Sequence, residues 1–413
     1  MTNVPQHRES ISLLCAAKTA LAFCSIGVLG VALSQPLSAQ TFTLLHTFTG
    51  GGDGGIPGGL VMDRAGNLYG ATVTGGLNGP GTVFKLKQTG SGWVLNPLYE
   101  FSRSNGDLGP DDAVILGPDG NVYGAVGTQN GYGAIFKLQP PPSACRTSLC
   151  YWTETHLYSF GDAPDGHAPN GNLVFDSAGN IYGTTEFGGT FGYGSIFKLS
   201  PAGGGWTESV LYSFMGGDDG DQPIDGVVMD GTGNLYGTTR FGGVPSCNDG
   251  CGTVFELSPS GGGWTEQILY RFPGFAGGYE PRVSVILDSA GNLYGTTYNG
   301  GDGSGTVFEL SPAGGGAWNY SMLYDLAGNG GGSESRLAMD SAGNLYGTFW
   351  LGPTLFKLSH SGGGWTYTDL HDFSDHDGNE PGGNLAIDSQ GNVYGTCAAE
   401  GQDLYGTAWQ VTP

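Results

Sequence analysis

The 413-residue sequence contains 80 glycines, and only 12% of its residues are charged, with 14 Lys and Arg against 37 Asp and Glu. The formal net charge of −23 disfavours DNA, RNA and anionic membranes as partners, because these are negatively charged themselves. Neutral ligands, cationic ligands and divalent cations remain compatible with it. Aromatic residues make up 12% of the chain, which argues against the disorder that a glycine-rich composition would otherwise suggest.

Residues 1–39 differ in composition from the rest. Arg8 and Lys18 precede an apolar stretch at 19–33, and SQPLSA follows it. This order is typical of a secretory signal peptide cleaved after Ala39, and the stretch is shorter than the ~20 residues that a membrane-spanning helix needs. Cleavage would remove two basic residues and one acidic residue and leave a net charge of −24. We therefore expect an exported protein with no membrane insertion after signal cleavage.

A repeated phrase organises the remaining chain. DSAGNLYGT occurs at 288–296 and again, unchanged, at 340–348, and five looser copies bring the total to seven. The asparagines of the copies are Asn67, Asn121, Asn180, Asn234, Asn292, Asn344 and Asn392. Their spacing of 48 to 59 residues favours propeller blades over the shorter repeats of solenoids.

Each period carries further motifs in a constant order. GTVFKL (81–86) follows the first phrase, and later periods show a glycine-rich tract ending in Trp, as in GGGWTE (203–208), and then LYSF (211–214). These runs alternate, are rich in Val, Ile, Thr, Tyr and Phe, and are bounded by glycines, which is the signature of strands. No stretch after residue 40 shows helical periodicity. The pattern predicts four strands per period.

The phrase itself predicts a hairpin turn. In DSAGN, Asp288 can accept a hydrogen bond from the backbone two residues on, and Gly291 stands where φ must be positive. In copy two Gly117 replaces the aspartate, and Pro118 preserves the turn by fixing φ. A copy that keeps the turn without this carboxylate favours a structural role for the aspartates over a ligand role.

The last copy stops after three strands, and TFTLLHTF at 41–48 supplies the missing one. Its Leu, His and Phe align with those of LHDF at 370–373. Pairing of 41–48 with the last copy would join the two ends of the repeat array and leave no open edge. We therefore predict an all-β, seven-bladed β-propeller, with four antiparallel strands per blade and the last blade closed by 41–48. Residues 40–413 would form this single domain, and we expect a monomer.

The combined motif carries a family resemblance. D-x-x-G-N-L-Y-G-T-T, G-T-V-F-K-L, G-G-W, L-Y-S-F and G-G-x-D-G-x-x-P, in this order, resemble the GloVer (Gloeo-Verruco) tandem repeat of exported bacterial proteins, over nearly all of 41–413. The resemblance implies a propeller that is secreted, periplasmic or on the bacterial cell surface. The resemblance implies no established catalytic residues that could be assigned to positions of this sequence.

Four cysteines form two closely spaced pairs in predicted inter-strand loops. Cys145 and Cys150 are one pair, and Cys247 and Cys251 are the other. In an exported chain such pairs favour local disulfides. A zinc site is the alternative, although neither C-x2-C nor a nearby histidine is present.

Two kinds of loop share each face of a four-stranded antiparallel meander. The DxxGN hairpins and the GGGW loops lie on one face, and the second-to-third-strand and fourth-to-first-strand loops lie on the other. We call the second face the variable-loop face, because its loops differ between copies and variable loops on a rigid scaffold commonly carry binding. Its aromatic side chains could stack on sugar rings, with packing between blades as the alternative. The candidates are Phe187, Phe191, Tyr193, Phe241, Tyr298 and Trp350.

The fourth-to-first-strand loops are acidic. In DHDGNEP, Asp375, Asp377 and Asn379 have the 1, 3, 5 spacing of a calcium loop. Glu380 stands where that loop needs glycine, and ordinary turn chemistry is the alternative. Calcium is therefore the one cofactor that the sequence leaves open.

The usual catalytic motifs are missing. G-x-S-x-G, H-E-x-x-H, C-x-x-C and G-K-[ST] do not occur, and the S-x-x-K at 195–198 lacks its companion motifs. We therefore expect a non-catalytic exported propeller that binds an extracellular glycan, polymer or protein through the variable-loop face. One alternative is a propeller lyase or hydrolase with a pocket at the channel mouth, between copies six and seven. The other is a structural envelope or matrix protein.

Overall fold

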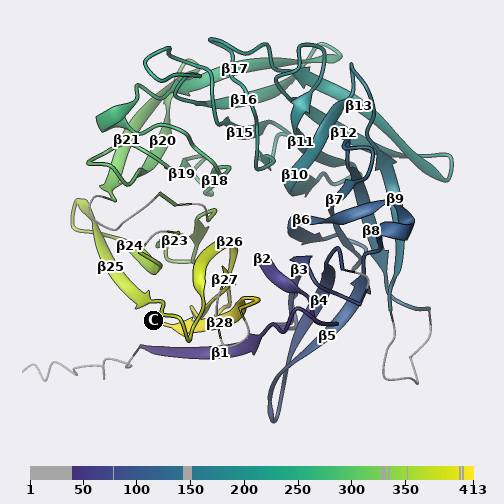
Figure 1. The fold of residues 1–413 in the computed structure, drawn as a ribbon. Coiled ribbons are helices and arrows are strands. Elements are labelled where there is room, and N and C mark those ends of the chain that lie inside the picture. Colours follow the sequence, from purple (N-terminus) through teal and green to yellow (C-terminus); the bar gives the residue numbers. More distant parts are fainter. Residues whose placement is uncertain are drawn as a thin grey trace, which may run out of the picture. The chain divides into compact units, whose positions relative to one another are not determined.

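The computed structural model describes residues 40–413 except 78, 143–150, 327–331, 334, 351, 400, 402 and 403. The predicted signal peptide, and the pair Cys145 and Cys150, lie outside these residues. The described chain forms seven four-stranded antiparallel sheets arranged in a ring (Figure 1), which confirms the predicted seven-bladed β-propeller. No helix in this part of the chain is long and apolar enough to span a membrane.

The first six blades each take four consecutive strands. Blade one contains β2 (Gly55–Met62), β3 (Leu68–Thr74), β4 (Thr82–Thr89) and β5 (Gly92–Glu100). Blade two contains β6 (Asp107–Leu116), β7 (Val122–Thr128), β8 (Ala134–Gln139) and β9 (Thr153–Ser159). Blade three contains β10 (Gly166–Phe175), β11 (Ile181–Gly188), β12 (Ser195–Ala202) and β13 (Gly205–Ser213).

The next three blades follow the same order with shorter first strands. Blade four contains β14 (Val228–Met229), β15 (Leu235–Thr239), β16 (Thr253–Ser260) and β17 (Gly263–Arg271). Blade five contains β18 (Ile286–Leu287), β19 (Leu293–Thr297), β20 (Thr306–Gly314) and β21 (Ala317–Asp325). Blade six contains β22 (Ala338–Met339), β23 (Leu345–Phe349), β24 (Thr354–Ser361) and β25 (Gly364–Asp372). Two 3-10 turns, η1 (Arg103–Asn105) and η2 (Phe275–Gly277), lie in fourth-to-first-strand loops.

The seventh blade joins the two ends of the described chain. Its strands are β26 (Asn379–Ile387), β27 (Val393–Ala399), β28 (Thr407–Thr412) and β1 (Thr41–Thr47). β1 pairs antiparallel with β28 along its length, and the two strands run side by side in Figure 1. The closure predicted from the LHTF and LHDF alignment is therefore correct.

In six of the seven copies the aspartate of the phrase accepts hydrogen bonds within its own turn, as predicted. Asp63 Oδ1 accepts hydrogen bonds from the backbone N–H groups of Ala65 and Asn67, and Oδ2 accepts from the Asn67 amide and the Tyr69 hydroxyl. Burial raises the pKa of Asp63, but these hydrogen bonds outweigh burial and lower it overall. The same hydrogen bonds recur at Asp176, Asp230, Asp288, Asp340 and Asp388.

Copy two keeps the carboxylate at a different position. The interpretation that the Gly117 substitution removes it is wrong, because Asp119 accepts hydrogen bonds from the Asn121 amide and the Tyr123 hydroxyl instead. Lys137 Nζ lies 3.0 Å from the same carboxylate oxygen. The turn thus keeps its acceptor when its position moves by two residues.

The glycine of each Tyr-Gly pair makes room for an aromatic ring of the third strand. A Cβ atom on Gly237 would lie 2.6 Å from Cζ of Phe255, which is fully buried. Equivalent rings meet the other six glycines, at Gly70, Gly124, Gly183, Gly295, Gly347 and Gly395. This ring-on-glycine contact explains why both motifs recur together in every period.

We expect Gly237→Ala to destabilise the protein by about 1–3 kcal/mol, because the added methyl group overpacks a closed core. Thermal unfolding followed by circular dichroism measures this. Gly231→Ala is the matched control, since a Cβ atom there meets nothing within 4 Å. Equal melting temperatures for the two variants would contradict the packing role of Gly237.

Tryptophans of the GGGW tracts join neighbouring blades. The ring of Trp264 in blade four packs edge-on against Tyr182 of blade three, at 6.2 Å between ring centroids. Trp318, Trp365 and Trp93 make the same contact with a tyrosine of the preceding blade.

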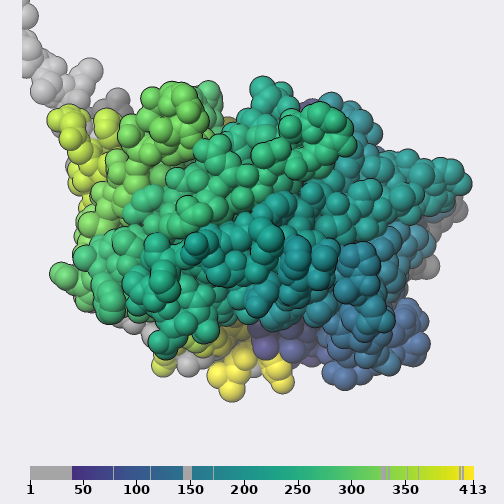
Figure 2. Space-filling model, turned by 90° about the horizontal axis from the view of Figure 1, so that it is seen from above, coloured from purple at the N-terminus to yellow at the C-terminus, as the bar shows by residue number. Residues whose placement is uncertain are grey.

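Figure 2 views the ring from its side, where residues of the middle of the chain, coloured teal and green, form a continuous wall.

Candidate functional site

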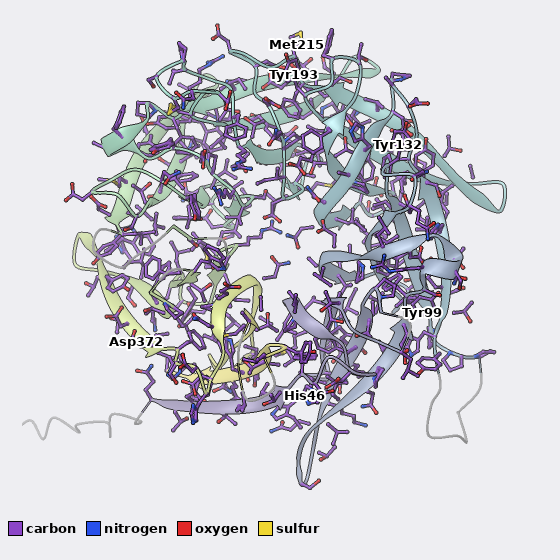
Figure 3. All side chains as sticks on the ribbon, viewed as in Figure 1. His46, Tyr99, Tyr132, Tyr193, Met215 and Asp372 are labelled. Carbon is purple, nitrogen blue, oxygen red and sulfur yellow. A yellow bond between two sulfur atoms is a disulfide. The ribbon has the colours of Figure 1, made fainter. Side chains whose placement is uncertain are left out.

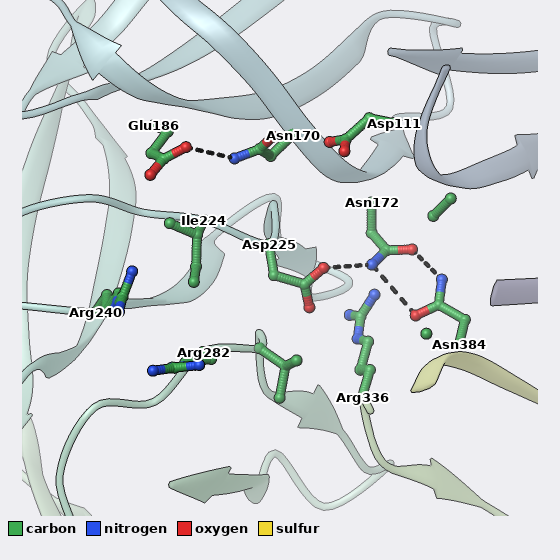
Figure 4. A pocket seen from close by; sticks show the side chains of 13 residues that line it. Asp111, Asn170, Asn172, Glu186, Ile224, Asp225, Arg240, Arg282, Arg336 and Asn384 are labelled. Atoms are coloured by element: carbon green, nitrogen blue, oxygen red, sulfur yellow. Dashed lines mark hydrogen bonds between the residues drawn. The ribbon is translucent and has the colours of Figure 1, made fainter. Parts of the chain in front are cut away.

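A polar cavity of about 350 Å³ lies at the centre of the ring, and we call it the channel mouth. Three arginines line it, namely Arg240, Arg282 and Arg336. Three carboxylates line it as well, namely Asp111, Glu186 and Asp225. Asn170, Asn172 and Asn384 add amide groups (Figure 4). The cavity therefore offers hydrogen-bond donors and acceptors of both charges within a small volume.

The repeat places nearly all of these side chains by one rule. Apart from Glu186 and Arg240, every lining residue stands four to six positions before a DxxGN phrase or its copy-two equivalent. At this point the first strand departs from regular pairing, either by a register shift, as between Asn170 and Val174, or by starting only later, as at β14. The departure turns these side chains toward the ring axis.

Glu186 and Arg240 reach the channel mouth from second-to-third-strand connections. Glu186 lies near the end of β11, and Arg240 directly follows β15. Because the other lining residues follow fourth-to-first-strand loops, the channel mouth belongs to the variable-loop face.

A hydrogen-bonded group crosses the ring axis, and we call it the trans-ring clasp. It consists of Asn172 of blade three, Asp225 of blade four and Asn384 of blade seven. The Asn172 amide donates to Asp225 Oδ1 at 2.8 Å and to Asn384 Oδ1 at 3.3 Å, and the Asn384 amide donates back to Asn172. Asp225 Oδ2 also accepts from the backbone N–H of Ser284 in blade five at 2.7 Å. The clasp thereby links four blades through side chains at the centre of the ring.

Arg336 adds a positive charge beside the clasp. Its guanidinium donates to the backbone carbonyl of Val285 at 3.1 Å and interacts electrostatically with Asp225. Burial raises the pKa of Asp225, although Arg336, Ser284 and Asn172 oppose this effect. Asp225 and Arg336 are therefore two half-buried ionisable groups that interact within the cavity wall.

A second, apolar cavity of about 330 Å³ continues along the first strands. It shares Asn172, Arg336 and Asn384 with the channel mouth, and aliphatic side chains such as Leu60 and Leu337 line most of the remainder. The clasp residues Asn172 and Asn384, together with Arg336, therefore lie between a polar mouth and an apolar inner channel.

Two of the mouth arginines rest on aromatic rings of the loops. The guanidinium carbon of Arg240 lies 4.6 Å from the centroid of Phe241, and that of Arg282 lies 3.4 Å from the centroid of Tyr298. Such stacking fixes the plane of a guanidinium. Arg282 also pairs with Glu280, with 3.3 Å between Nη2 and Oε2. Burial raises the pKa of Glu186, and the nearby Asn170 amide and Arg240 charge oppose it.

The six aromatic candidates lie in loops or strand ends of the variable-loop face, but none of them lines the channel mouth. Phe191 and Tyr193 are exposed, at 53% and 42%, and Figure 3 shows Tyr193 at the outer rim of the ring. The other four, Phe187, Phe241, Tyr298 and Trp350, are half-buried. Phe241 and Tyr298 act as supports for arginines, which sequence reasoning did not anticipate. Ligand binding by the six stays a prediction.

The carboxylates of the acidic loops mostly fasten their own loops. Asp53, Asp165 and Asp219 each lie within hydrogen-bond distance of a fourth-strand Tyr or His side chain and of a loop N–H group. Asp377 follows this pattern, with His371 Nε2 at 3.1 Å and the Ser374 hydroxyl at 3.1 Å. The arrangement matches the turn chemistry named as the alternative to a calcium loop.

The calcium candidates gain no support from the geometry of the described side chains. Among the residues that the structure describes, no group of three or more His, Cys, Asp and Glu side chains is placed to hold a metal ion. Asn379 Oδ1 accepts a hydrogen bond from the backbone N–H of Glu380. Calcium binding by Asp375, Asp377 and Asn379 stays a prediction.

Cys247 and Cys251 lie at disulfide distance, with 2.12 Å between their sulfur atoms. They belong to the second-to-third-strand loop of blade four. This loop borders another cavity, of about 400 Å³, which Phe241, Phe275 and Tyr279 also line. Because Arg240 and Phe241 are consecutive residues, the aromatic cavity adjoins the channel mouth.

The sequence did carry a signal for the channel mouth. Residues 224–226, 282–284 and 382–384 occupy equivalent places in three periods, and they read IDG, RVS and GGN. Such variation before a constant phrase marks positions that the fold does not dictate. The expectation of a pocket between copies six and seven captured Arg336 and Asn384, but the channel mouth also takes residues from copies two to five.

Comparisons with known proteins agree with this architecture. The chain is similar in fold to virginiamycin B lyase from Staphylococcus aureus, with a TM-score of 0.53 and 14% identity over 91% of this chain and 99% of that chain. It is also similar to a fungal alcohol oxidase in complex with copper, with a TM-score of 0.54 and 14% identity over 90% of this chain and 76% of the other. At this identity the likeness shows the fold alone.

Sequence comparison is more specific. No curated protein matches the chain in sequence. The Gloeobacter/Verrucomicrobia repeat, in contrast, matches residues 27–244 and 146–354 in two overlapping stretches. These stretches include six of the seven copies of the phrase and most of the propeller. The chain therefore belongs to the Gloeobacter/Verrucomicrobia repeat family.

Proposed function

We propose that the protein is an exported propeller that binds an extracellular glycan or similar polar polymer at the channel mouth and releases it unchanged. The observation that carries this proposal is the convergence of arginine, carboxylate and amide side chains from six blades on one cavity. Hydroxyl-rich ligands need such a mixture of donors and acceptors, and the cavity volume lies in the range of small-ligand sites.

The surroundings of the channel mouth support a ligand longer than one unit. The aromatic cavity beside Arg240 offers Phe241, Phe275 and Tyr279, and Phe275 is 74% exposed. Flat apolar rings of this kind stack on sugar rings. Phe191 and Tyr193 would extend the contact across the same face.

Export is part of the proposal. The composition of residues 1–39 favours a signal peptide. The disulfide-bonded pair Cys247 and Cys251 supports an oxidising compartment, because such bonds form and persist mainly outside the cytosol.

A comparison of two tryptophan variants tests the proposed site. Ile224 lines the channel mouth, and we expect Ile224→Trp to block it and abolish capture of polymer in pull-downs and on glycan arrays. Leu77→Trp is the matched control, because Leu77 is 78% exposed on the same face and lies outside the cavity. The control variant should bind as the unmodified protein does.

Three outcomes decide between the candidates. Absence of any glycan or polymer binding by the unmodified protein would refute the proposal. Capture of a protein instead of a glycan would support the protein-ligand form of the sequence prediction. Progressive cleavage of a bound glycan would support the lyase or hydrolase alternative, which the fold itself does not decide, since similar propellers include a lyase and an oxidase.

A further inference from the structure

Three arginines of this acidic chain meet at the channel mouth, beside three carboxylates. The described residues include eleven lysines and arginines, and three of these line this one cavity. Four others, the third-strand lysines Lys85, Lys137, Lys198 and Lys357, lie near tyrosine rings within single blades. An arginine inside a concave site can attract an anionic group of a ligand locally, although the chain as a whole is strongly acidic.

Two arginine N–H groups in the cavity wall lack partners. The Nε atoms of Arg240 and Arg336 are buried, and neither makes a hydrogen bond within the described residues. A buried donor without an acceptor costs free energy, so a ligand oxygen that reaches the guanidinium groups of these arginines would be stabilising. Guanidinium edges match the two oxygens of a carboxylate better than they match a single hydroxyl.

Acceptor groups lie on the same cavity wall. Glu186 Oε2 is 3.4 Å from the Asn170 amide, which is a long hydrogen bond, and Glu186 also experiences the charge of Arg240. Carboxylate oxygens at this place can accept hydrogen bonds from the hydroxyl groups of a ligand. They would repel a second negative charge next to them.

These observations narrow the ligand class. A neutral sugar would leave the arginine N–H groups without a charged partner, and a cationic ligand would be repelled by the arginines. A simple dicarboxylate would bring negative charge against Glu186. A sugar acid suits both the arginines and Glu186, because it carries one carboxylate and several hydroxyl donors.

Resting on the proposed function, we infer that the channel mouth recognises a uronate unit of an acidic glycan. Arg240, held in plane by Phe241, pairs with the uronate carboxylate, and Glu186 accepts hydrogen bonds from ring hydroxyls. Arg336 contributes positive charge at the base of the mouth. The recognition depends on the carboxylate.

Isothermal titration calorimetry with a trigalacturonate, its methyl ester and a neutral galactose trimer tests this inference. We expect the free acid to bind about tenfold or more tightly than the ester, as is usual for a hydrogen bond to a charged group. Arg240→Gln should remove this preference, so that the variant binds the free acid and the ester about equally. Arg240→Lys keeps the charge without the planar fork and should retain only part of the preference.

Arg103→Gln is the matched control. Arg103 is exposed in η1 on the same face and lies outside the cavity, so the variant loses the same charge without touching the site. An equal loss of acid binding in Arg103→Gln would overturn the inference in favour of general electrostatic attraction. A melting temperature for each variant shows that its fold is intact.

The failure of this inference is distinguishable from failure of the proposed function. If arrays yield glycan ligands that Ile224→Trp abolishes, but acid and ester bind equally, the uronate assignment is wrong and the binding function stands. If the unmodified protein binds no glycan at all, both are wrong.

Discussion

Deleting residues 41–48 should lower the melting temperature by roughly 10 °C or more, or prevent folding altogether. β1 forms the outer strand of blade seven and pairs with β28 from Thr41 to Thr47. Leu45 and Phe48 are buried at its inner side. Truncation of a single buried Leu or Phe side chain costs about 2–5 kcal/mol, and the whole stability of a domain is about 5–15 kcal/mol.

The strand does more than complete one sheet. The ring of Phe42 stacks on His371 of blade six at 4.1 Å between centroids, and the ring of Phe48 meets Phe84 of blade one at 5.1 Å. β1 therefore contacts blades six, seven and one, and its loss would open the ring where its ends meet. Without it, the β28 edge would also present unpaired backbone groups to other chains.

Scanning calorimetry of the truncated protein measures the effect. Leu44→Ala is the control on the same strand, because Leu44 is 39% exposed, and it should change stability by no more than about 0.5 kcal/mol. A synthetic peptide of residues 40–48, added to the truncated protein, should restore part of the lost stability. An unchanged melting temperature after the deletion would contradict closure of the ring by β1.

This closure could be predicted from sequence because every period of the repeat contains the same set of strands. Each period specifies which strand types a blade needs, so a missing fourth strand at one end and a surplus one at the other can be matched. The DxxGN turns could be predicted for the same reason, since one local hydrogen-bond pattern explains seven copies. The error at Gly117 arose because Asp119 meets the same donors from another position, which three-dimensional geometry alone reveals.

The channel mouth could not be predicted in the same way. Most of its residues share a position in the period but differ in residue type, as Ala113, Asn172 and Arg336 illustrate. Their convergence depends on the ring bringing blades three and seven, 212 residues apart at Asn172 and Asn384, within hydrogen-bond distance. The aromatic residues were easier to notice in the sequence, but Phe241 and Tyr298 support arginines and do not line the cavity themselves.

A second group of side chains that sequence did not reveal lies between the outer strands of neighbouring blades. Glu208 of β13 and Glu266 of β17 each have a buried carboxylate oxygen without a hydrogen-bond partner in the described chain. Glu208 lies near Asp165, and Glu266 lies near Asp219. In both cases the neighbouring aspartate belongs to the loop that leads from the preceding blade, so a like-charge pair sits at the junction.

These junctions should make the protein more stable in mild acid than in mild base. Burial, and then the neighbouring aspartate, raise the pKa of Glu208 and of Glu266 from the ordinary 4.5 to about 7. A carboxyl whose pKa is raised by folding favours the folded state when it is protonated. Its contribution is therefore complete below about pH 4.5 and disappears as the pH rises through about 7.

The turn aspartates have the opposite pH dependence, and they limit the stability of the protein at low pH. Folding lowers the pKa of Asp63, Asp340 and Asp388 below 3.8, because hydrogen bonds to the ionised form outweigh burial. Their contribution is present above about pH 3.8 and is lost as the pH falls further. The two groups together place the maximum of stability near pH 5.

We therefore expect the melting temperature to be highest near pH 5 and to fall by several degrees at pH 8. Glu208→Gln and Glu266→Gln should each raise the melting temperature at pH 8, because they remove a charge beside an aspartate and supply an amide that can donate to it. Both carboxyls are partly solvated, which limits each effect to the order of 1 kcal/mol. At pH 5, where the glutamates are already neutral in the folded protein, the same substitutions should change little.

Differential scanning fluorimetry between pH 4 and pH 9 follows this dependence directly. Asp302→Asn is the control, since Asp302 is exposed in a loop of blade five and its loss removes one negative charge without affecting a junction. If Asp302→Asn stabilises the protein at pH 8 as much as Glu208→Gln does, the high net negative charge of the chain explains the pH dependence, and the junction carboxylates do not. If the junction variants instead gain more in melting temperature than Asp302→Asn, and this gain grows as the pH rises from 5 to 8, the pH dependence comes from the contacts between blades.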